Sequence, residues 1–241
     1  MTESRSPTQQ VSRQPVPSIA VVIPALNEEE ALPSVLKGLT AEAPDALVVV
    51  VDNGSTDRTA EVARAHGATV VHQPIRGYGG ACLAGFAFLS ADPPEVVVVM
   101  DGDNSDFATD LGLLTGPVLQ DRADMVLGER VSLGDAGSLL PNQRFGNWLA
   151  TRIIGRHTGY RYRDMGPFRA IRWTSLQSLQ MCDPAYGWNV EMQMKAVQRG
   201  LRIQEVPVRY RNRIGQSKIS GTVRGTVKAG IGILAACWRY R

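Results

Sequence analysis

Short runs of apolar residues alternate with longer segments of mixed polarity along most of the chain. The runs are rich in valine and too short for helices, as expected of strands that are covered on both faces. They fall at residues 19–23, 47–51, 68–71, 96–100 and, more briefly, 125–127. Helix-length segments separate them, which predicts an α/β domain with a mainly parallel sheet flanked by helices. The loops that follow the strands then meet at one sheet edge, where ligands bind in such folds.

Cap and turn residues predict where several helices begin and end. Asn27 and Glu30 have the spacing of a capping box, so a helix is expected to begin at Asn27. Residues 55–57 are expected to open a second helix, which Gly67 closes. The other expected elements are a helix at 81–90 behind a glycine-rich loop at 76–80, helices near 143–155 and 187–199, and a strand at 202–210.

The composition fits one globular domain of 241 residues. Hydrophobic residues make up 44% and charged residues 20%, which excludes disorder over the whole length. The three cysteines are far apart, odd in number and without zinc-site spacing, so we expect reduced thiols in a cytoplasmic protein. No stretch reaches 18 consecutive apolar residues, so no membrane-spanning helix is expected.

Polarity and charge divide the chain into three expected parts. Residues 1–17 are polar, lack the apolar core of a signal peptide, and are expected to be a disordered lead-in. Residues 18–220 form the expected domain, and residues 221–241 a basic tail. From residue 199 onward there are ten Lys and Arg against one acid, whereas the first 198 residues carry a net charge of −6. This asymmetry indicates a metal or sugar site in the acidic part and an anionic partner near the tail.

Acidic side chains follow three of the predicted strands. Glu28 follows the first, Asp52 the second, and Asp101 and Asp103 the fourth. Carboxylates gathered at one edge repel one another unless a cation or hydrogen-bond donors compensate. Asp101 and Asp103 flank one glycine and point the same way in an extended segment, a spacing that suits Mg²⁺ or Mn²⁺ holding phosphate oxygens. For any single loop, helix capping or turn formation is the alternative explanation.

The glycine-rich loop Arg76-Gly-Tyr-Gly-Gly80 matches neither of the common nucleotide-binding loops. It lacks the third glycine of a Rossmann fingerprint and the G-K-[ST] of a Walker loop. Its glycines either let the backbone approach a ligand closely or simply make a turn.

Taken in order, the motifs resemble family 2 of the inverting glycosyltransferases. Within it they are most similar to the branch that transfers glucose or mannose to polyprenyl or dolichyl phosphate. The similar segments, between about Ile19 and Thr222, are V-V-I-P-A-L-N-E, V-D-N-G-S-T-D, R-G-Y-G-G-A, M-D-G-D, G-E-R, D-M-G-P-F-R-A-I and R-I-G-Q-S-K-I-S-G-T. The resemblance implies a single-domain GT-A fold, a UDP- or GDP-sugar donor and a divalent cation, Mg²⁺ or Mn²⁺.

On the donor side the resemblance implies contacts to nucleotide and metal. These are Pro24, Leu26 and Glu28 at the nucleobase, Asp52, Arg76 and Gly79 beside the nucleotide, and Asp101 and Asp103 at the metal and the diphosphate. Two positions depart from the family pattern. Asn53 stands where a second Asp is frequent, and Ser105 where a Gln often follows the D-x-D. Asp106 either takes the place of that Gln as a metal contact or caps the next helix.

On the acceptor side the resemblance implies a phosphate-binding pair, Arg130 and Arg144, because the planar guanidinium binds phosphate well. The other implied residues are Asp164 and Arg169 in the next motif, and Arg213 and Lys218 closing over the donor diphosphate. A hydroxyl acceptor would need a general base, for which Asp164 and Glu191 are the candidates. A phosphate monoester is already ionised near neutral pH and needs none. Asp164 would then orient Arg169 or the sugar.

Residues 222–240 have the pattern of an amphipathic helix. Val223, Val227, Ile231, Leu234 and Trp238 share one face, with basic residues beside it. Either this helix packs on the domain, or it lies in the membrane surface beside anionic lipid. The second possibility describes a peripheral enzyme at the inner face of the cell membrane, acting on a polyprenyl phosphate.

Two alternatives stay open at this point. One is a transferase that acts on a soluble hydroxyl compound or another lipid. The other is a sugar-nucleotide-binding protein without transfer activity, against which the Asp101–Asp103 and Arg130–Arg144 pairs argue. A nucleic-acid partner is not expected, because the basic tail lacks an interleaved aromatic platform.

Overall fold

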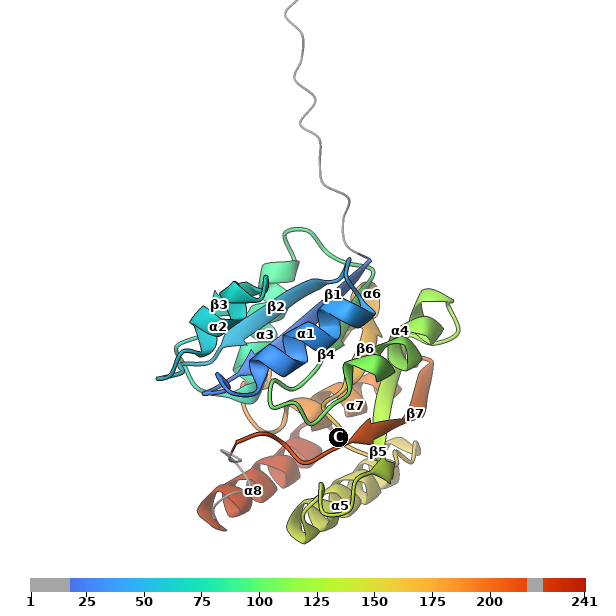
Figure 1. Cartoon of the computed structure of the whole chain (residues 1–241). Coiled ribbons are helices and arrows are strands. Elements are labelled where there is room, and N and C mark those ends of the chain that lie inside the picture. Colours follow the sequence, from blue (N-terminus) through green and yellow to red (C-terminus); the bar gives the residue numbers. More distant parts are fainter. Residues whose placement is uncertain (1–17, 216–222) are drawn as a thin grey trace, which may run out of the picture.

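The computed structural model describes residues 18–215 and 223–241, apart from the side chains of 223–229. Its described strands form a seven-stranded sheet in the order β3-β2-β1-β4-β6-β5-β7 (Figure 1). The first four of these strands are parallel to one another. β6 runs antiparallel to both β4 and β5, and β7 is parallel to β5. The predicted mainly parallel α/β sheet is therefore confirmed.

The strands and helices alternate along the first half of the chain, as predicted. The strands are β1 (Ile19–Ala25), β2 (Leu47–Asp52), β3 (Thr69–His72), β4 (Val96–Val99), β5 (Met125–Gly134), β6 (Arg169–Arg172) and β7 (Ile203–Tyr210). The helices are α1 (Leu32–Glu42), α2 (Thr59–Ala65), α3 (Tyr78–Leu89), α4 (Leu111–Leu119), α5 (Pro141–Thr158), α6 (Trp173–Leu179), α7 (Trp188–Gln198) and α8 (Val223–Arg239), with a short 3₁₀ turn at Ala108–Asp110.

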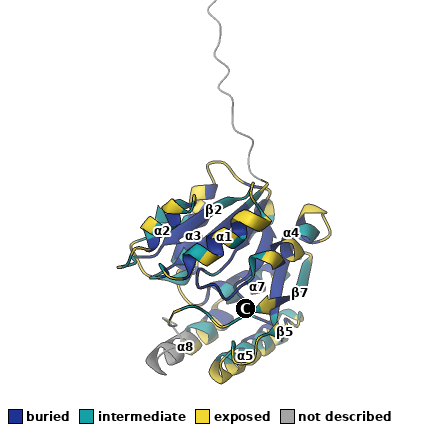
Figure 2. Ribbon diagram, viewed as in Figure 1, coloured by how far each residue is buried: buried dark blue, intermediate teal, exposed yellow. Residues whose placement is uncertain are grey.

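Alternate side chains of each central strand enter two separate cores, because successive side chains of a strand point to opposite faces. Val21, Val50 and Val98 pack with residues of α1, α2 and α4 on one face. Val22 and Val97 pack with α3, α6 and α7 on the other. Figure 2 shows the resulting buried sheet between two helical layers. The valine-rich runs are thus strands covered on both faces.

The capping box predicted at Asn27 is wrong. α1 begins at Leu32, five residues later, and Asn27 has a left-handed φ of 53°. Its side-chain oxygen accepts a hydrogen bond from the Thr56 amide (2.8 Å), and its own amide donates to Ser55 Oγ (3.0 Å). The polar groups of Asn27 therefore join two strand-end loops, which places the loops after β1 and β2 side by side.

Two elements of the second half have no counterpart in the sequence prediction. β6 and α6 follow one another over residues 169–179, and β6 inserts between β4 and β5. With only four residues, β6 is too short to show a period that identifies a strand. Its insertion brings β5 and β7 into the same sheet as the acidic strand ends.

Close packing of α3 on β1 depends on Gly85. A Cβ added at this glycine would lie 2.5 Å from Val22 Cγ1 and 3.2 Å from Val51 Cγ2. We expect Gly85→Ala to lower the free energy of unfolding by about 1–3 kcal/mol, as overpacking of a tight core does, measured by urea unfolding. The matched control is Gly112→Ala in α4, where an added Cβ meets no atom within 4 Å. Equal stability of the two variants would contradict this packing.

Candidate active site

A cavity of about 1050 Å³ runs from the carboxyl ends of β1 and β4 to helices α5 and α8. Its first end is lined by residues of the acidic strand loops, which include Pro24, Leu26, Glu28, Arg76, Asp101 and Asp103. Its second end is lined by Arg130 and by apolar residues of the two helices, which include Phe145, Leu149, Ile233 and Leu234. The cavity therefore joins a polar, acidic end to a largely apolar one.

Three carboxylates gather where β4 ends. Asp103 and Asp106 are buried and Asp101 is partly buried. Burial and the neighbouring charge of Asp103 raise the pKa of Asp101 to about 7. Burial, together with Asp101 and Asp103, raises the pKa of Asp106 well above its usual value. Asp106 Oδ2 accepts from the Asp101 amide (3.3 Å), and its Oδ1 has no hydrogen-bond partner among the described residues. Negative charge is thus concentrated here beyond what the nearby donors compensate.

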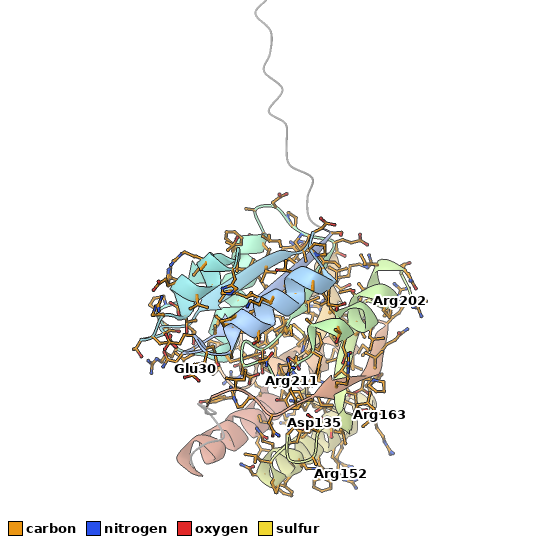
Figure 3. The ribbon with its side chains drawn as sticks, viewed as in Figure 1. Glu30, Asp135, Arg152, Arg163, Arg202 and Arg211 are labelled. Carbon is orange, nitrogen blue, oxygen red and sulfur yellow. The ribbon has the colours of Figure 1, made fainter. Side chains whose placement is uncertain are left out.

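Arg213 faces this cluster. Its guanidinium lies 2.8 Å from Asp103 Oδ2 and 3.6 Å from Glu28 Oε1. The segment after β7 is held against the D-x-D loop, because Arg211 donates its amide to Ser105 O and Ile214 donates to Asp103 O. Arg211, labelled in Figure 3, also donates from Nε to Asn104 O (2.6 Å). Backbone pairing therefore delivers Arg213 to the acidic end of the cavity.

The donor set at this end fits a divalent cation. Asp101 and Asp103 both line the cavity, and carboxylate oxygens are the ligands that Mg²⁺ and Mn²⁺ prefer. Among the described residues, Asp103 pairs with Arg213, and the Asp101 carboxylate accepts a hydrogen bond from the Tyr78 hydroxyl. Ser105 does not line the cavity; its hydroxyl donates to Asp103 Oδ1 from behind. Asp106 does not line it either, and it caps no helix, since Phe107 precedes the 3₁₀ turn.

Asn53 lines the cavity, whereas Asp52 does not. The Asn53 side chain donates to Ile75 O (3.0 Å) and accepts from the Gly77 amide (2.8 Å), so it holds the glycine loop beside the strand end. Asp52 accepts from the Ser55 amide (3.0 Å) and lies 3.2 Å from His72 Nδ1. Asp52 therefore shapes the loop that presents Asn53.

The glycine loop is shaped by close contact with another stretch of backbone. A Cβ at Gly77 would lie 2.3 Å from Pro184 O, and one at Gly79 would lie 2.1 Å from Asp183 O. The Gly80 amide donates to Pro184 O (2.9 Å). Gly79 is buried beneath this stretch and does not line the cavity, while Arg76 at the start of the loop does. The glycines here serve backbone packing beside the cavity.

Arg130 is fixed by Asp164. Its Nε lies 2.7 Å from Asp164 Oδ2 and its Nη2 2.9 Å from Oδ1, and its amide also donates to Oδ2 (3.0 Å). Burial alone would raise the pKa of Asp164, but the charge and hydrogen bonds of Arg130 outweigh it and the pKa is lowered. Asp164 therefore orients Arg130 at the wall of the cavity. The family resemblance had implied that Asp164 orients Arg169 or the sugar instead.

The other implied acceptor-side residues take different places. Arg144 is exposed on α5 and does not line the cavity, so it is not paired with Arg130 there. Arg169 is fully buried; it donates to Pro167 O (3.2 Å) and to Gly166 O, and its guanidinium lies 5.4 Å from the centroid of the Trp188 ring. It braces the turn before β6 from inside the core. Lys218 lies outside the described residues.

Glu191 is an anchor for a loop. It is fully buried, and it accepts from the amides of Cys182 (2.9 Å) and Asp183 (2.7 Å) and from Lys195 Nζ (2.6 Å). Burial would raise its pKa, but these hydrogen bonds lower it. It does not line the cavity. The interpretation of Glu191 as a general base is therefore wrong, because its carboxylate is committed to the 182–183 backbone.

The second end of the cavity opens between α5 and α8, which lie side by side at the end of the molecule away from α2 (Figure 1). α8 packs inward through small residues, since Ala236 and Cys237 are buried. Its large side chains face outward, with Ile231 63% and Trp238 67% exposed. On α5, Phe145 (62%) and Trp148 (53%) are exposed as well. The two helices and the residue before α5 thus carry a set of exposed apolar side chains, which we call the α5–α8 surface: Leu140, Phe145, Trp148, Ile231, Leu234 and Trp238. Phe145 and Leu234 of this set also line the cavity.

Cations lie beside the α5–α8 surface. Arg152 on α5 (Figure 3) is 5.8 Å from the centroid of the Trp148 ring, and Arg241 is 4.9 Å from that of Trp238.

None of the helices in the described part of the chain combines the length and the apolar character that a membrane span requires.

Several cavity residues were not identified from the sequence. Tyr78, Trp188, Asn189 and Tyr210 all line the cavity. They come from the starts of α3 and α7 and the end of β7, and only the fold brings them together. The sequence feature that could have identified Tyr78 is its place inside the glycine-rich loop.

The fold and the cavity define a class of protein: an α/β domain whose parallel strands present carboxylates and a large cavity at their carboxyl edge, as in enzymes that bind nucleotide sugars. Residues 20–176 match the model of glycosyl transferase family 2. The chain belongs to this family, and its fold is the GT-A fold.

Proteins that are similar to this chain over most of its length are also sugar transferases by name. An uncharacterized glycosyltransferase of Mycobacterium tuberculosis is 39% identical over 220 residues, covering 88% of this chain and 94% of its own. A dolichyl-phosphate hexose transferase of Haloferax volcanii is 33% identical over 224 residues, covering 92% and 95%. A crystal structure of glucosyl-3-phosphoglycerate synthase from Mycobacterium tuberculosis, in complex with Mn²⁺, UDP and glucosyl-3-phosphoglycerate, superposes with a TM-score of 0.74 at 25% identity, covering 92% and 79%.

The buried Arg130–Asp164 ion pair is expected to contribute to the stability of the fold. Asp164→Asn leaves the guanidinium without its counter-charge, so we expect the free energy of unfolding at pH 7 to fall by about 3–5 kcal/mol. Because the folded-state pKa of Asp164 is lowered, its contribution is present above the unfolded pKa and is lost as the pH falls through the folded one. The difference between wild type and variant should therefore narrow below about pH 4.

Urea unfolding across this pH range measures the effect. The control is Asp121→Asn, which removes an exposed carboxylate paired with Arg172 and Arg202 and should change stability little. A constant difference down to low pH would mean that the Asp164 charge does not contribute.

Proposed function

We propose that this protein transfers a hexose from a nucleoside-diphosphate sugar to the phosphate of a polyprenyl-phosphate lipid, with a divalent cation, at the inner surface of the cell membrane. The carrying observation is the second end of the cavity, where Arg130 stands at the wall and the mouth opens onto the α5–α8 surface. An acceptor with an anionic head and a long apolar chain fits this combination of one cation and many apolar side chains.

The carboxylates also favour a phosphate acceptor. Among the described residues that line the cavity, the acids are Glu28, Asp101 and Asp103, all at the donor end. Asp164 and Glu191, the two candidate bases, are held by Arg130 and by backbone amides respectively. A sugar or glycerol hydroxyl would need a base near Arg130, whereas an ionised phosphate needs only to be oriented.

Charge at the donor end suits departure of a nucleoside diphosphate. Asp101 and Asp103 would hold Mg²⁺ or Mn²⁺, which neutralises the negative charge that develops on the leaving diphosphate. Arg213 already lies at this end and can donate to the same phosphates. Pro24, Leu26 and Glu28 line the part of the cavity that the nucleobase would occupy. In-line attack by the acceptor phosphate then inverts the anomeric carbon.

The α5–α8 surface supports membrane contact. Exposed Trp and Phe side chains with Arg beside them are typical of elements that lie at a lipid surface. The sequence predicted only the tail helix for this role; the structure places α5 next to it. Arg144, exposed on α5, is available to anionic headgroups on this surface.

A product assay tests the acceptor. The protein is incubated with Mn²⁺ and a panel of UDP- and GDP-sugars, with either a short polyprenyl phosphate or 3-phosphoglycerate, and the products are analysed by mass spectrometry. We expect a hexosyl polyprenyl phosphate. If product forms only from 3-phosphoglycerate, the acceptor is a soluble phosphate compound, as for the glucosyl-3-phosphoglycerate synthase, and the lipid acceptor is rejected. If the nucleotide sugar is hydrolysed without transfer, both acceptors are rejected.

Substitution at the D-x-D tests the cation site. Asp103→Asn removes a charge with little change in shape, and we expect turnover at saturating donor to fall about 10²-fold or more. The matched control is Asp92→Asn, an exposed carboxylate after α3, which should leave turnover unchanged. Circular dichroism and urea unfolding check that both variants fold. Wild-type turnover in Asp103→Asn would reject the assignment.

The membrane contact is tested by a double variant on the α5–α8 surface. Trp148→Ser with Trp238→Ser removes two exposed aromatic side chains that do not line the cavity. Sedimentation with phosphatidylglycerol vesicles should fall about tenfold or more, while calorimetric binding of the nucleotide sugar is unchanged. Leu113→Ser, an exposed leucine of α4, is the control. High salt should weaken wild-type binding, because the charge contribution is screened. Equal sedimentation of all three proteins would place the membrane contact elsewhere.

A further inference from the structure

Tyr78 joins the glycine loop to the carboxylate cluster. It is the first residue of α3, and its hydroxyl donates a hydrogen bond to Asp101 Oδ1 (3.1 Å). It lines the cavity. Its ring meets the Trp188 ring edge to face, with centroids 5.8 Å apart. This hydrogen bond connects the start of α3 to the Asp101 carboxylate.

The position of Tyr78 is set by the backbone on both sides. The Gly77 amide donates to Asn53 Oδ1 (2.8 Å), and the Gly80 amide donates to Pro184 O (2.9 Å). No side chain larger than hydrogen fits at Gly77 or Gly79, because the 183–184 backbone occupies that space. The loop is therefore clamped between the end of β2 and the 183–184 backbone, with Tyr78 between its two attachment points.

The 183–184 backbone is itself anchored. Glu191 accepts from the amides of Cys182 and Asp183, and Lys195 pairs with the same carboxylate at 2.6 Å. Trp188, in the first turn of α7, also packs on the ring of Phe86. A continuous series of contacts thus leads from the buried Glu191 through the glycine loop to Tyr78.

We infer that Tyr78 is a positioning residue for the cation site: its hydroxyl fixes one oxygen of Asp101 and holds the carboxylate in the orientation that binds the metal. This inference rests on the proposed role of Asp101 as a metal ligand. Partners that orient a ligating carboxylate contribute substantially to metal affinity.

The test compares two Tyr→Phe substitutions, each of which removes one hydroxyl. Tyr78→Phe removes the donor to Asp101. Tyr162→Phe removes a buried hydroxyl that donates to Gln193 O at 2.9 Å, away from the cavity lining. Mn²⁺ alone is titrated into each full-length protein, and free Mn²⁺ is counted by electron paramagnetic resonance. Urea unfolding of both variants shows whether they are folded to a similar extent.

We expect Tyr78→Phe to weaken Mn²⁺ binding about 10-fold or more, and Tyr162→Phe to bind Mn²⁺ as the wild type does. Equal Mn²⁺ affinity of Tyr78→Phe and wild type would overturn the role of Tyr78 while leaving the cation site in place. Equal weakening in both variants would also overturn it, because the effect would then be a general loosening. Absence of Mn²⁺ binding to the wild type would overturn the cation site itself, and the inference with it.

Discussion

The concentration of three carboxylates at the end of β4 is the constraint on which the rest of the site depends. Asp101, Asp103 and Asp106 repel one another at short range, and burial together with neighbouring carboxylates raises the pKa of Asp101 and of Asp106. Arg213 pairs with one carboxylate and the Tyr78 hydroxyl donates to another. Under the proposed function, a divalent cation would supply the remaining positive charge, and the carboxylates that repel one another here would hold the cation and the donor diphosphate.

The change of strand direction after β4 brings the compensating groups to this place. β6 returns antiparallel between β4 and β5, so β5 and β7 join the sheet of the parallel strands that end in carboxylates. Arg130 then comes from β5, and Arg213 from the segment that leaves β7 and pairs with the D-x-D loop. Carboxylates after β1 and β4 therefore share one cavity with guanidinium groups from β5 and from the segment after β7.

Much of the first half of the fold could be predicted, because its strands are buried on both faces and appear as unbroken valine runs. The D-x-D and the family could also be predicted, because each rests on short motifs of adjacent residues. Asn27 shows where local reasoning fails: a capping pattern was present, but hydrogen bonds to a loop about 30 residues away determined the conformation. The positions of Glu191 and Arg144 depend on the tertiary fold in the same way. Their side-chain types suit catalysis, but the tertiary fold directs one into a loop anchor and the other to the surface.

The two ends of the cavity have different physical requirements, and the structure separates them. Under the proposed function, the donor end needs fixed negative charge for a cation, which Asp101 and Asp103 would supply. The acceptor end would need positive charge without a competing carboxylate, because a free acid beside Arg130 would repel a phosphate nucleophile. Asp164 gives both oxygens to Arg130, which fixes the guanidinium in place and leaves Asp164 paired and outside the cavity lining. With α5 and α8 directing large apolar side chains outward at the mouth, a lipid chain would remain in an apolar environment while its phosphate reaches Arg130.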